Sequence, residues 1–172
     1  MEFDWIGDDG TAERCVVALS PRGGMRVESR VVGPFGTCGY RASTDEEWRF
    51  TELTLELGGR RLDVRRRDAG WTVDGTPRPD LAPAVDLDLS ISPVTNTLPI
   101  RRLALRIGDS ADLTTGYVAV PELTVAPDPQ RYTRTGAREY RYESLDSEFA
   151  RTITVDEAGF VVEYPGLFHR GG

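Results

Sequence analysis

Two aspartates, Asp86 and Asp88, have the type and spacing that acid–base chemistry requires. They alternate with Val85, Leu87 and Leu89, so a strand would place both carboxylates on one face, about 7 Å apart at roughly 3.3 Å per residue. The paired carboxylates of glycoside hydrolases have separations in this range. The same spacing is common on the polar face of a structural strand, where arginines neutralise the acids. The pair is therefore a hypothesis for hydrolysis beside a simpler structural interpretation.

Other catalytic constellations are missing from the sequence. His169 is the single histidine and lies close to the end of the chain, in a tail expected to be mobile from about residue 169, so a Ser–His–Asp triad is not expected. Cys15 and Cys38 are the only cysteines and do not complete a zinc site, so we expect them buried and reduced, with no bound metal. No glycine-rich phosphate loop precedes a helix. We therefore expect no cofactor, and a binding protein in preference to an enzyme.

Aromatic residues and arginines supply the remaining candidate surfaces. Trp48, Trp71, Tyr132 and Tyr164 belong to an aromatic set that could line a lipid or sugar cavity, because aromatic rings offer large apolar faces with polar edges. Packing in the core is the alternative for most of them. The run RRLDVRRR at 60–67 could bind an anion or, beside acids on the preceding strand, form a neutralised and solvated face.

Composition limits the classes of partner. The 172 residues include 39% hydrophobic and 28% charged residues, as in a single globular domain spanning 1–172. A net charge of -7 argues against a nucleic-acid partner, since affinity for nucleic acid comes mainly from neutralised phosphates. No apolar run has membrane-spanning length and no secretory signal is recognised, so we expect a cytoplasmic protein.

The elements that must position these residues are strands. Apolar residues alternate with polar ones through 53–57, 62–64 and 85–91, and turn signals recur at short intervals, which predicts a meander of antiparallel hairpins. One helix is expected between Thr95 and Leu103, with Thr95 or Asn96 as its N-cap and with Leu98, Ile100 and Leu103 buried. A weak internal repeat, in which DAGWTVD at 68–74 matches EAGFVVE at 157–163, favours two similar halves.

Several segments resemble the glycolipid-binding family of bacterial proteins. The resemblance begins at Trp5-Ile-Gly and Glu13-Arg-Cys15, and is most specific in VDLDLS at 85–90 followed by PVTNTLPIRRL at 93–103. It continues through Gln130-Arg-Tyr132, YRYES at 140–144 and YPGLF at 164–168. The resemblance implies a mainly β fold, a single-domain antiparallel spiral β-roll wrapped around one short helix. Members often carry Gly-Cys before the Asp-x-Asp strand, where this chain has Pro83-Ala84.

The resemblance implies noncatalytic binding of a lipid-like or glycolipid-like amphipathic molecule in a cleft between the sheet and the helix. The residues expected to bind it are Trp48, Arg49, Trp71, Asp86, Asp88, Asn96, Arg101, Arg102, Gln130, Tyr132 and Tyr164. We expect Arg101 and Arg102 to hold the helix to the sheet, with at most one of them reaching a ligand. Two alternatives stay open, a carbohydrate-active hydrolase using Asp86 and Asp88, and a protein-interaction module without a small ligand. The oligomeric state is not predicted.

Overall fold

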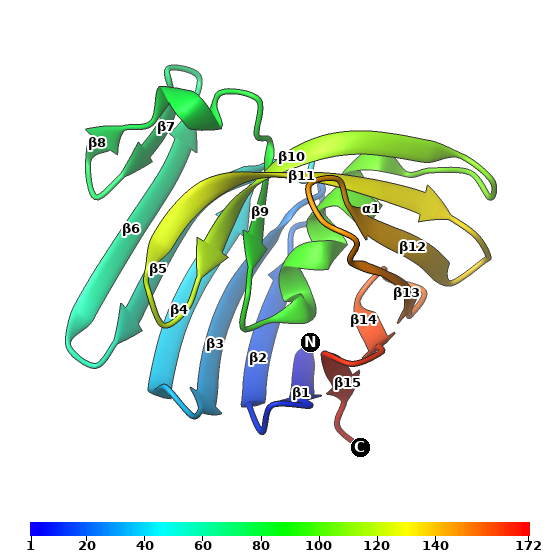
Figure 1. Ribbon diagram of the computed structural model, residues 1–172, viewed down its shortest axis with the longest axis horizontal. Helices are drawn as coiled ribbons and strands as arrows, with labels where there is room; N and C mark the ends of the chain where they lie inside the picture. Colours follow the sequence, from blue (N-terminus) through cyan, green and yellow to red (C-terminus); the bar gives the residue numbers. More distant parts are fainter.

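A computed structural model describes residues 1–172 as one mainly β domain. Its strands are β1 (Glu2–Gly7), β2 (Ala12–Leu19), β3 (Met25–Gly33), β4 (Gly36–Thr44), β5 (Phe50–Leu57), β6 (Arg60–Arg67), β7 (Gly70–Val73), β8 (Thr76–Pro77), β9 (Asp86–Leu89), β10 (Ser110–Ala119), β11 (Thr124–Arg134), β12 (Glu139–Ser144), β13 (Ala150–Val155), β14 (Val161–Tyr164) and β15 (Phe168–Arg170). All fifteen form one sheet, in the order β8 to β1 followed by β15 to β9 (Figure 1). The edge strands β8 and β9 do not pair with each other, so the sheet is open.

Alternation of apolar and polar residues gives the long strands one buried and one exposed face. In β3, Met25, Val27 and Val31 are buried. The residues that alternate with them, Arg26, Glu28 and Arg30, are exposed. The buried faces of β1 to β6 pack with the helical segment in one core cluster, in which Leu53 and Leu55 have no exposed surface. The predicted mainly β, antiparallel architecture is therefore confirmed.

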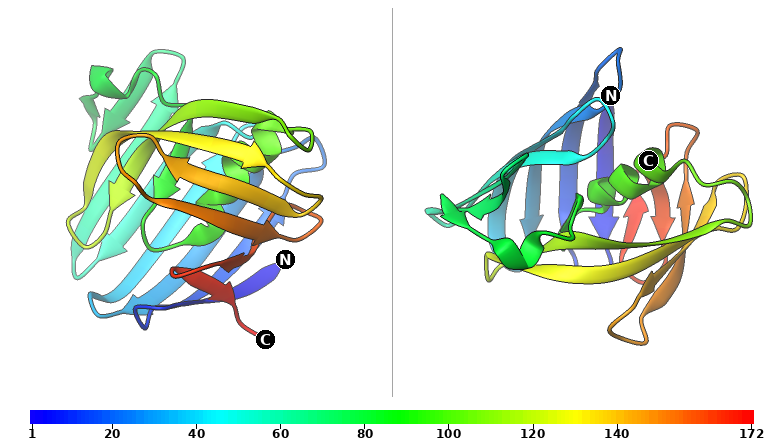
Figure 2. Two further views of the ribbon diagram at one scale, coloured as in Figure 1. Left: turned by 45° about the vertical axis from the view of Figure 1, so that its right-hand side comes forward. Right: turned by 90° about the horizontal axis from the view of Figure 1, so that it is seen from above.

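A single parallel pair of strands explains why this β protein contains a helix. β9 and β10 are the only parallel neighbours, and parallel strands need a crossover connection in place of a tight turn. The crossover contains a 3-10 helix, η2 (Pro93–Asn96), and an α-helix, α1 (Thr97–Leu103). Seen from above, α1 lies between the two arms of the curved sheet (Figure 2). A third helical turn, η1 (Pro79–Leu81), precedes β9.

The helical segment begins earlier than the sequence predicts. Its N-cap is Ser92, whose side chain accepts a hydrogen bond from the backbone N–H of Val94 at 3.3 Å. Pro93 follows at the first helical position, where its missing N–H removes no hydrogen bond. Of the two residues predicted as the N-cap, Asn96 does precede α1 in the N-cap position, but its side chain makes no capping hydrogen bond, and Thr95 lies inside η2.

Burial along α1 agrees with the prediction at two of three positions. Leu98 and Ile100 are buried, but Leu103, which was also predicted to be buried, is half-buried. Ala104 adopts a left-handed conformation, φ 45°, and ends the helix directly after Leu103. The last turn therefore lies beside solvent, and Leu98 and Ile100 supply most of the apolar contact of α1 with the sheet.

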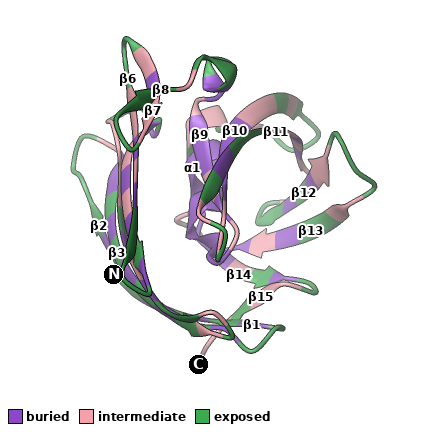
Figure 3. Ribbon diagram, turned by 60° about the vertical axis from the view of Figure 1, so that its left-hand side comes forward, coloured by how far each residue is buried: buried purple, intermediate pink, exposed green.

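Arginine side chains connect the β6–β8 end of the sheet to the hairpin of β10 and β11, although no strand pairing joins these two parts. The guanidinium group of Arg60 donates hydrogen bonds to the carbonyl oxygens of Pro121 and Glu122 at 2.9 and 2.7 Å. Arg78 donates to the carbonyl oxygen of Val125 at 2.7 Å. Figure 3 shows the result, with the buried helix and β9 enclosed by the curved sheet and the exposed residues on its outer surface.

The carboxyl-terminal residues are part of the sheet. The sequence predicts a mobile tail from about residue 169, whereas His169 lies in β15, which pairs with β1 and β14. Arg170 donates to the carboxylate of Asp156 at 2.9 Å and to the carbonyl oxygen of Phe160 at 3.1 Å. Pairing with the first strand therefore orders the end of the chain.

The two cysteines are buried and free, as predicted. Cys15 lies on β2 and Cys38 on β4, and β3 separates them. Adjacent strands lie about 4.8 Å apart, so strands separated by a third are too distant for the Cα spacing of a disulfide. This arrangement leaves both thiols unpaired.

The internal repeat corresponds to two hairpin turns, β6–β7 and β13–β14. In each turn a glycine with positive φ, Gly70 at 111° and Gly159 at 86°, precedes a buried aromatic residue, Trp71 or Phe160. Glycine tolerates this left-handed conformation, which explains the shared Ala-Gly-aromatic pattern. Both turns belong to one continuous sheet.

Candidate functional site

A pocket of about 370 Å³ lies between the start of the helical segment and the strands that follow it in the sheet. We call it the Asp88 pocket. Its lining comes from η2, from the turn between β12 and β13, and from six strands: β9, β10, β11, β12, β14 and β15. It is lined by Asp88, Leu89, Ser90, Ser92, Asn96, Tyr117, Asp128, Tyr142, Ser144, Asp146, Ser147, Phe149, Tyr164, Leu167 and Phe168.

Asp88 is the central acid of this pocket. Its carboxylate accepts hydrogen bonds from the side-chain amide of Gln130 at 2.7 Å and from the hydroxyl of Thr95 at 3.4 Å. The same amide nitrogen of Gln130 donates to Asp128 at 2.6 Å, so the two carboxylates lie on either side of one donor. Burial, with a smaller contribution from the charge of Asp128, raises the pKa of Asp88 to about 6. Asp88 therefore titrates close to neutral pH.

A buried polar network holds Ser92 and Asn96 in the pocket lining. The side-chain amide of Asn96 donates to the hydroxyl of Tyr132 at 2.8 Å, which fixes Asn96 at the pocket surface. Ser92 accepts a hydrogen bond from Tyr40 at 2.9 Å, and Tyr40 also contacts the carboxyl group of Glu13 at 2.6 Å. Burial raises the pKa of Glu13 above its usual range. The helix N-cap and the pocket wall are thus fastened to β2 and β4.

Aromatic rings form the apolar wall. The centroid of the Tyr142 ring lies 5.9 Å from that of Phe149 and 6.1 Å from that of Tyr164, and the Phe149 and Tyr164 centroids are 6.5 Å apart. Tyr132 packs edge-on against Tyr142 from behind, at 5.5 Å. Carboxylates, hydroxyls and an amide therefore line one pocket together with aromatic rings, which suits a molecule with both polar and apolar parts.

Asp86, the other acid of the predicted pair, has a structural position. It is fully buried and accepts two hydrogen bonds from Nε of Arg102, at 3.0 and 3.2 Å, and one from Nη2 at 2.5 Å. It does not line the Asp88 pocket. A hydrolase would need both carboxylates to reach one substrate, so this geometry disfavours the Asp86–Asp88 pair as catalytic groups.

Trp48 and Arg101 lie at a different pocket, on the other side of α1. The guanidinium carbon of Arg101 is 4.7 Å from the centre of the Trp48 ring, and both residues line a depression of about 570 Å³. Nη1 of Arg101 also donates to the carbonyl oxygen of Ala158 at 3.2 Å. Arg49, the next residue after Trp48, is exposed near Glu47.

Trp71 has a packing role. Its indole N–H donates to the carbonyl oxygen of Ala84 at 3.0 Å, and its ring stacks on that of Phe50 with centroids 5.0 Å apart. The predicted binding residues thus separate into three groups. Asp88, Asn96 and Tyr164 line the Asp88 pocket with Gln130 and Tyr132 directly behind them, Trp48 and Arg101 share the second pocket, and Arg49, Trp71, Asp86 and Arg102 lie outside both.

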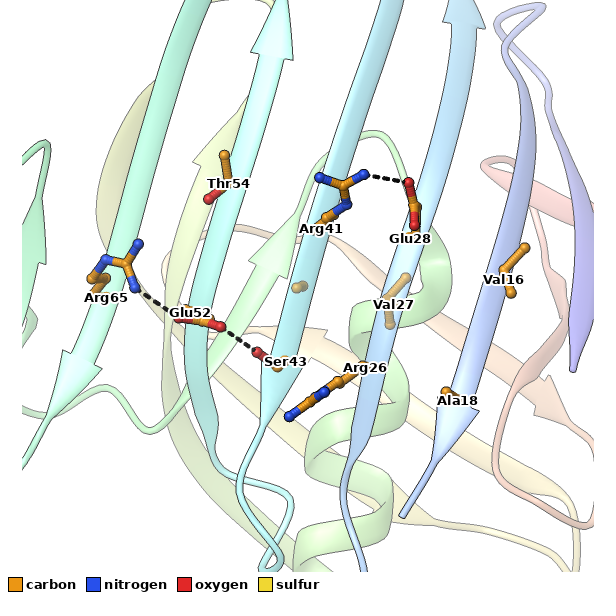
Figure 4. A pocket seen from close by; sticks show the side chains of 11 residues that line it. Val16, Ala18, Arg26, Val27, Glu28, Arg41, Ser43, Glu52, Thr54 and Arg65 are labelled. Carbon is orange, nitrogen blue, oxygen red and sulfur yellow. Dashed lines mark hydrogen bonds and ion pairs between the residues drawn. The ribbon is translucent and has the colours of Figure 1, made fainter.

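Several arginines on the outer face of the sheet pair with acids, whereas Arg26 in the same groove forms no ion pair. Figure 4 shows a groove across β2 to β6 in which Arg41 pairs with Glu28 at 2.7 Å and Arg65 pairs with Glu52 at 2.7 Å. These side chains are largely exposed. Such pairs are solvated and have little charge left for an anionic ligand.

Several pocket residues were missed by sequence reasoning, chiefly Tyr117, Asp128, Asp146 and Phe149. One of them carried a usable signal, because Asp128 precedes Gln130 by two residues on β11 and so shares its face. Asp146 and Phe149 belong to the turn before β13, whose position depends on the curvature of the whole sheet.

Comparison with known proteins decides the family. The chain matches the family described as "Putative glycolipid-binding" over residues 3–170. It belongs to that family. The chain is also similar to the crystal structure of a DUF1089 family protein from Pseudomonas aeruginosa, with 33% sequence identity, a TM-score of 0.78 and 92% of each chain covered. No curated protein matches the chain.

The family predicted from the sequence motifs is thereby confirmed. Its helices are all too short or too polar to cross a membrane.

The raised pKa of Asp88 predicts a pH-dependent effect of Asp88→Asn. Because the folded protein holds the Asp88 proton more tightly than the unfolded chain, its contribution to stability falls as pH rises from about 4 to about 6. The change from 3.8 to about 6 corresponds to about 3 kcal/mol. Urea unfolding should therefore show Asp88→Asn gaining stability over wild type between pH 4 and pH 7, by up to about 3 kcal/mol.

Asp112→Asn is the matched control, with the same chemical change on the exposed surface. The hydrogen bond from Arg131 lowers the pKa of Asp112 below its ordinary 3.8, so any difference in stability between this variant and wild type should change little between pH 4 and pH 7. A gain for Asp88→Asn that is equal at pH 4 and pH 7 would contradict the raised pKa.

Proposed function

We propose that this protein binds, without transforming it, a lipid-like or glycolipid-like amphipathic molecule whose polar head group lies in the Asp88 pocket. The observation that carries the proposal is the division of the pocket lining. Asp88, Ser92 and Asn96 contribute hydrogen-bonding groups to the lining, and Phe149 and Tyr164 contribute aromatic surface. The family description supports the same class of ligand.

The volume and position of the pocket support this function. About 370 Å³ is at the lower end of the range for small-molecule sites, which suits a head group with its acyl chain directed outward. The rim residues Leu167 and Phe168 would contact the first part of such a chain. The opposite side of the helical segment, around Val94 and Leu98, is filled by core side chains.

The two alternatives have less support. Hydrolysis by Asp86 and Asp88 would require Asp86 to leave its buried pair with Arg102. Glycoside turnover that disappears in Asp88→Asn would nevertheless replace the binding proposal with a catalytic one. For a protein-interaction module, the ion-paired outer face of β2 to β6 offers no large apolar patch to a partner.

Native mass spectrometry of protein purified from its own host tests the proposal. We expect an added mass of an amphipathic molecule on the wild-type protein. Phe149→Ala, which removes a half-buried ring from the pocket, should lower the occupied fraction several-fold because it deletes apolar contact with the ligand.

Phe35→Ala is the control, since Phe35 is also half-buried and lies outside the pocket at the β3–β4 turn. Its occupied fraction should equal that of wild type. A wild-type protein that carries no added mass and binds no octyl glucoside in calorimetry would contradict the proposal.

A further inference from the structure

The three acids of the Asp88 pocket lie close together without a cationic side chain among them. Asp88 and Asp128 accept hydrogen bonds only from neutral side chains, and Asp146 accepts one from Ser144 at 2.7 Å. None of these three forms an ion pair, and no arginine lines the pocket. By contrast, the acids on the outer face and the buried Asp86 have arginine partners. The pocket therefore concentrates negative charge that the protein does not neutralise.

The pocket acids also have fewer hydrogen-bond donors nearby than they could accept from. The amide nitrogen of Gln130 has two hydrogens but three acceptors within reach, Asp88 at 2.7 Å, Asp128 at 2.6 Å and Thr115 at 3.2 Å. The amide oxygen of Gln130 accepts no hydrogen bond, although the residue has no exposed surface. The carboxylates of Asp88 and Asp128, which line the pocket, therefore share donors and keep acceptor capacity that a ligand with N–H groups would fill.

The aromatic wall adds a second kind of attraction for a cation. Tyr142, Phe149 and Tyr164 place three ring centres within 5.9 to 6.5 Å of one another beside the carboxylates. The faces of aromatic rings are negative and attract ammonium groups, and rings grouped around a pocket are a recurrent way to bind them. The Phe149 ring already attracts one cation, because the guanidinium carbon of Arg151 lies 4.6 Å from its centre. Carboxylates and aromatic rings together are therefore complementary to an organic cation.

We propose that the head group bound in the Asp88 pocket carries an ammonium group, which lies between the carboxylates of Asp88, Asp128 and Asp146 and the rings of Tyr142, Phe149 and Tyr164. This inference rests on the proposed function and names the chemistry of its ligand. An amino sugar and an ethanolamine group both present such a cation. A phosphate-only or carboxylate head group is disfavoured by the unpaired acids.

Calorimetry with amphiphiles of equal chain length tests the inference. The probes are octyl glucoside, its 2-amino-2-deoxy analogue and octyl phosphoethanolamine. We expect the amino sugar to bind at least about tenfold more tightly than octyl glucoside at pH 7, the order of difference that one desolvated carboxylate or cation–π contact provides. Tighter binding of octyl phosphoethanolamine than of the amino sugar would assign the cation to ethanolamine.

Variants separate the charge from the rings. Asp146→Asn, at an exposed pocket residue, should weaken binding of the amino sugar about three- to tenfold more than binding of octyl glucoside. Phe149→Leu keeps an apolar side chain but removes the ring, so it should reduce the preference for the amino sugar over octyl glucoside. Asp112→Asn, which removes an exposed acid outside the pocket, is the control and should bind all three probes as wild type does.

The possible failures are distinguishable. Equal affinity for octyl glucoside and its amino analogue would overturn the ammonium inference while the proposed binding of an amphipathic molecule stands. No binding of any probe would overturn both.

Discussion

Replacing Arg102 with glutamine should lower the free energy of unfolding by about 3 to 5 kcal/mol, the usual cost of breaking a buried ion pair by removing one partner. Asp86 has no exposed surface, and three hydrogen bonds from Arg102 are the side-chain contacts that satisfy its carboxylate. Without them a carboxylate on β9 would be left in the interior. Because that carboxylate can take up a proton, the loss should be smaller at pH 4 than at pH 7.

Arg101→Gln is the control, one position earlier on the same helix. Arg101 is exposed and contacts the Trp48 ring and one carbonyl oxygen, so its loss should cost about 1 kcal/mol. Urea unfolding of both variants measures the difference. Equal and small losses would show that Arg102 does not hold α1 to the sheet.

Leu98→Ala should be the second strongly destabilising change, with a cost of about 2 to 5 kcal/mol. Leu98 is 3% exposed and packs in the same core cluster as Leu53 and Leu55, so the truncation leaves a cavity between helix and sheet. Leu103→Ala, the same change on the same helix, should cost less because Leu103 is half-buried. Equal losses in thermal or urea unfolding would contradict the packing described for α1.

The fold could largely be predicted because its information is local. Period-two alternation specifies which face of each strand is buried, and the turn signals separate the strands. The helix was found because PVTNTLPIRRL at 93–103 interrupts that alternation. The 3-10 turn η2 before it was not predicted, because Ser92, followed directly by Pro93, was not considered as a cap.

The candidate site could be predicted only in part because its residues meet through the curvature of the sheet. Asp88 and Asn96 belong to one continuous motif and were recognised together. Asp146 and Phe149 reach the same pocket from a turn about fifty residues further along the chain, and no local pattern relates them to β9. Trp48 was predicted to belong to the same site, but it lines the second pocket with Arg101. The residue type alone does not indicate which pocket an aromatic side chain enters.

The order of strands has a consequence for how the chain folds. From β8 to β1 and from β15 to β9, every neighbour in the sheet is also the next strand in sequence. Apart from the β9–β10 crossover, only the pairing of β1 with β15 joins strands that are far apart in the chain. Each half can therefore form hairpin by hairpin with low contact order, whereas joining the halves closes a loop of nearly the whole chain. The two halves can thus form as separate curved sheets before the pairing of β1 with β15 joins them.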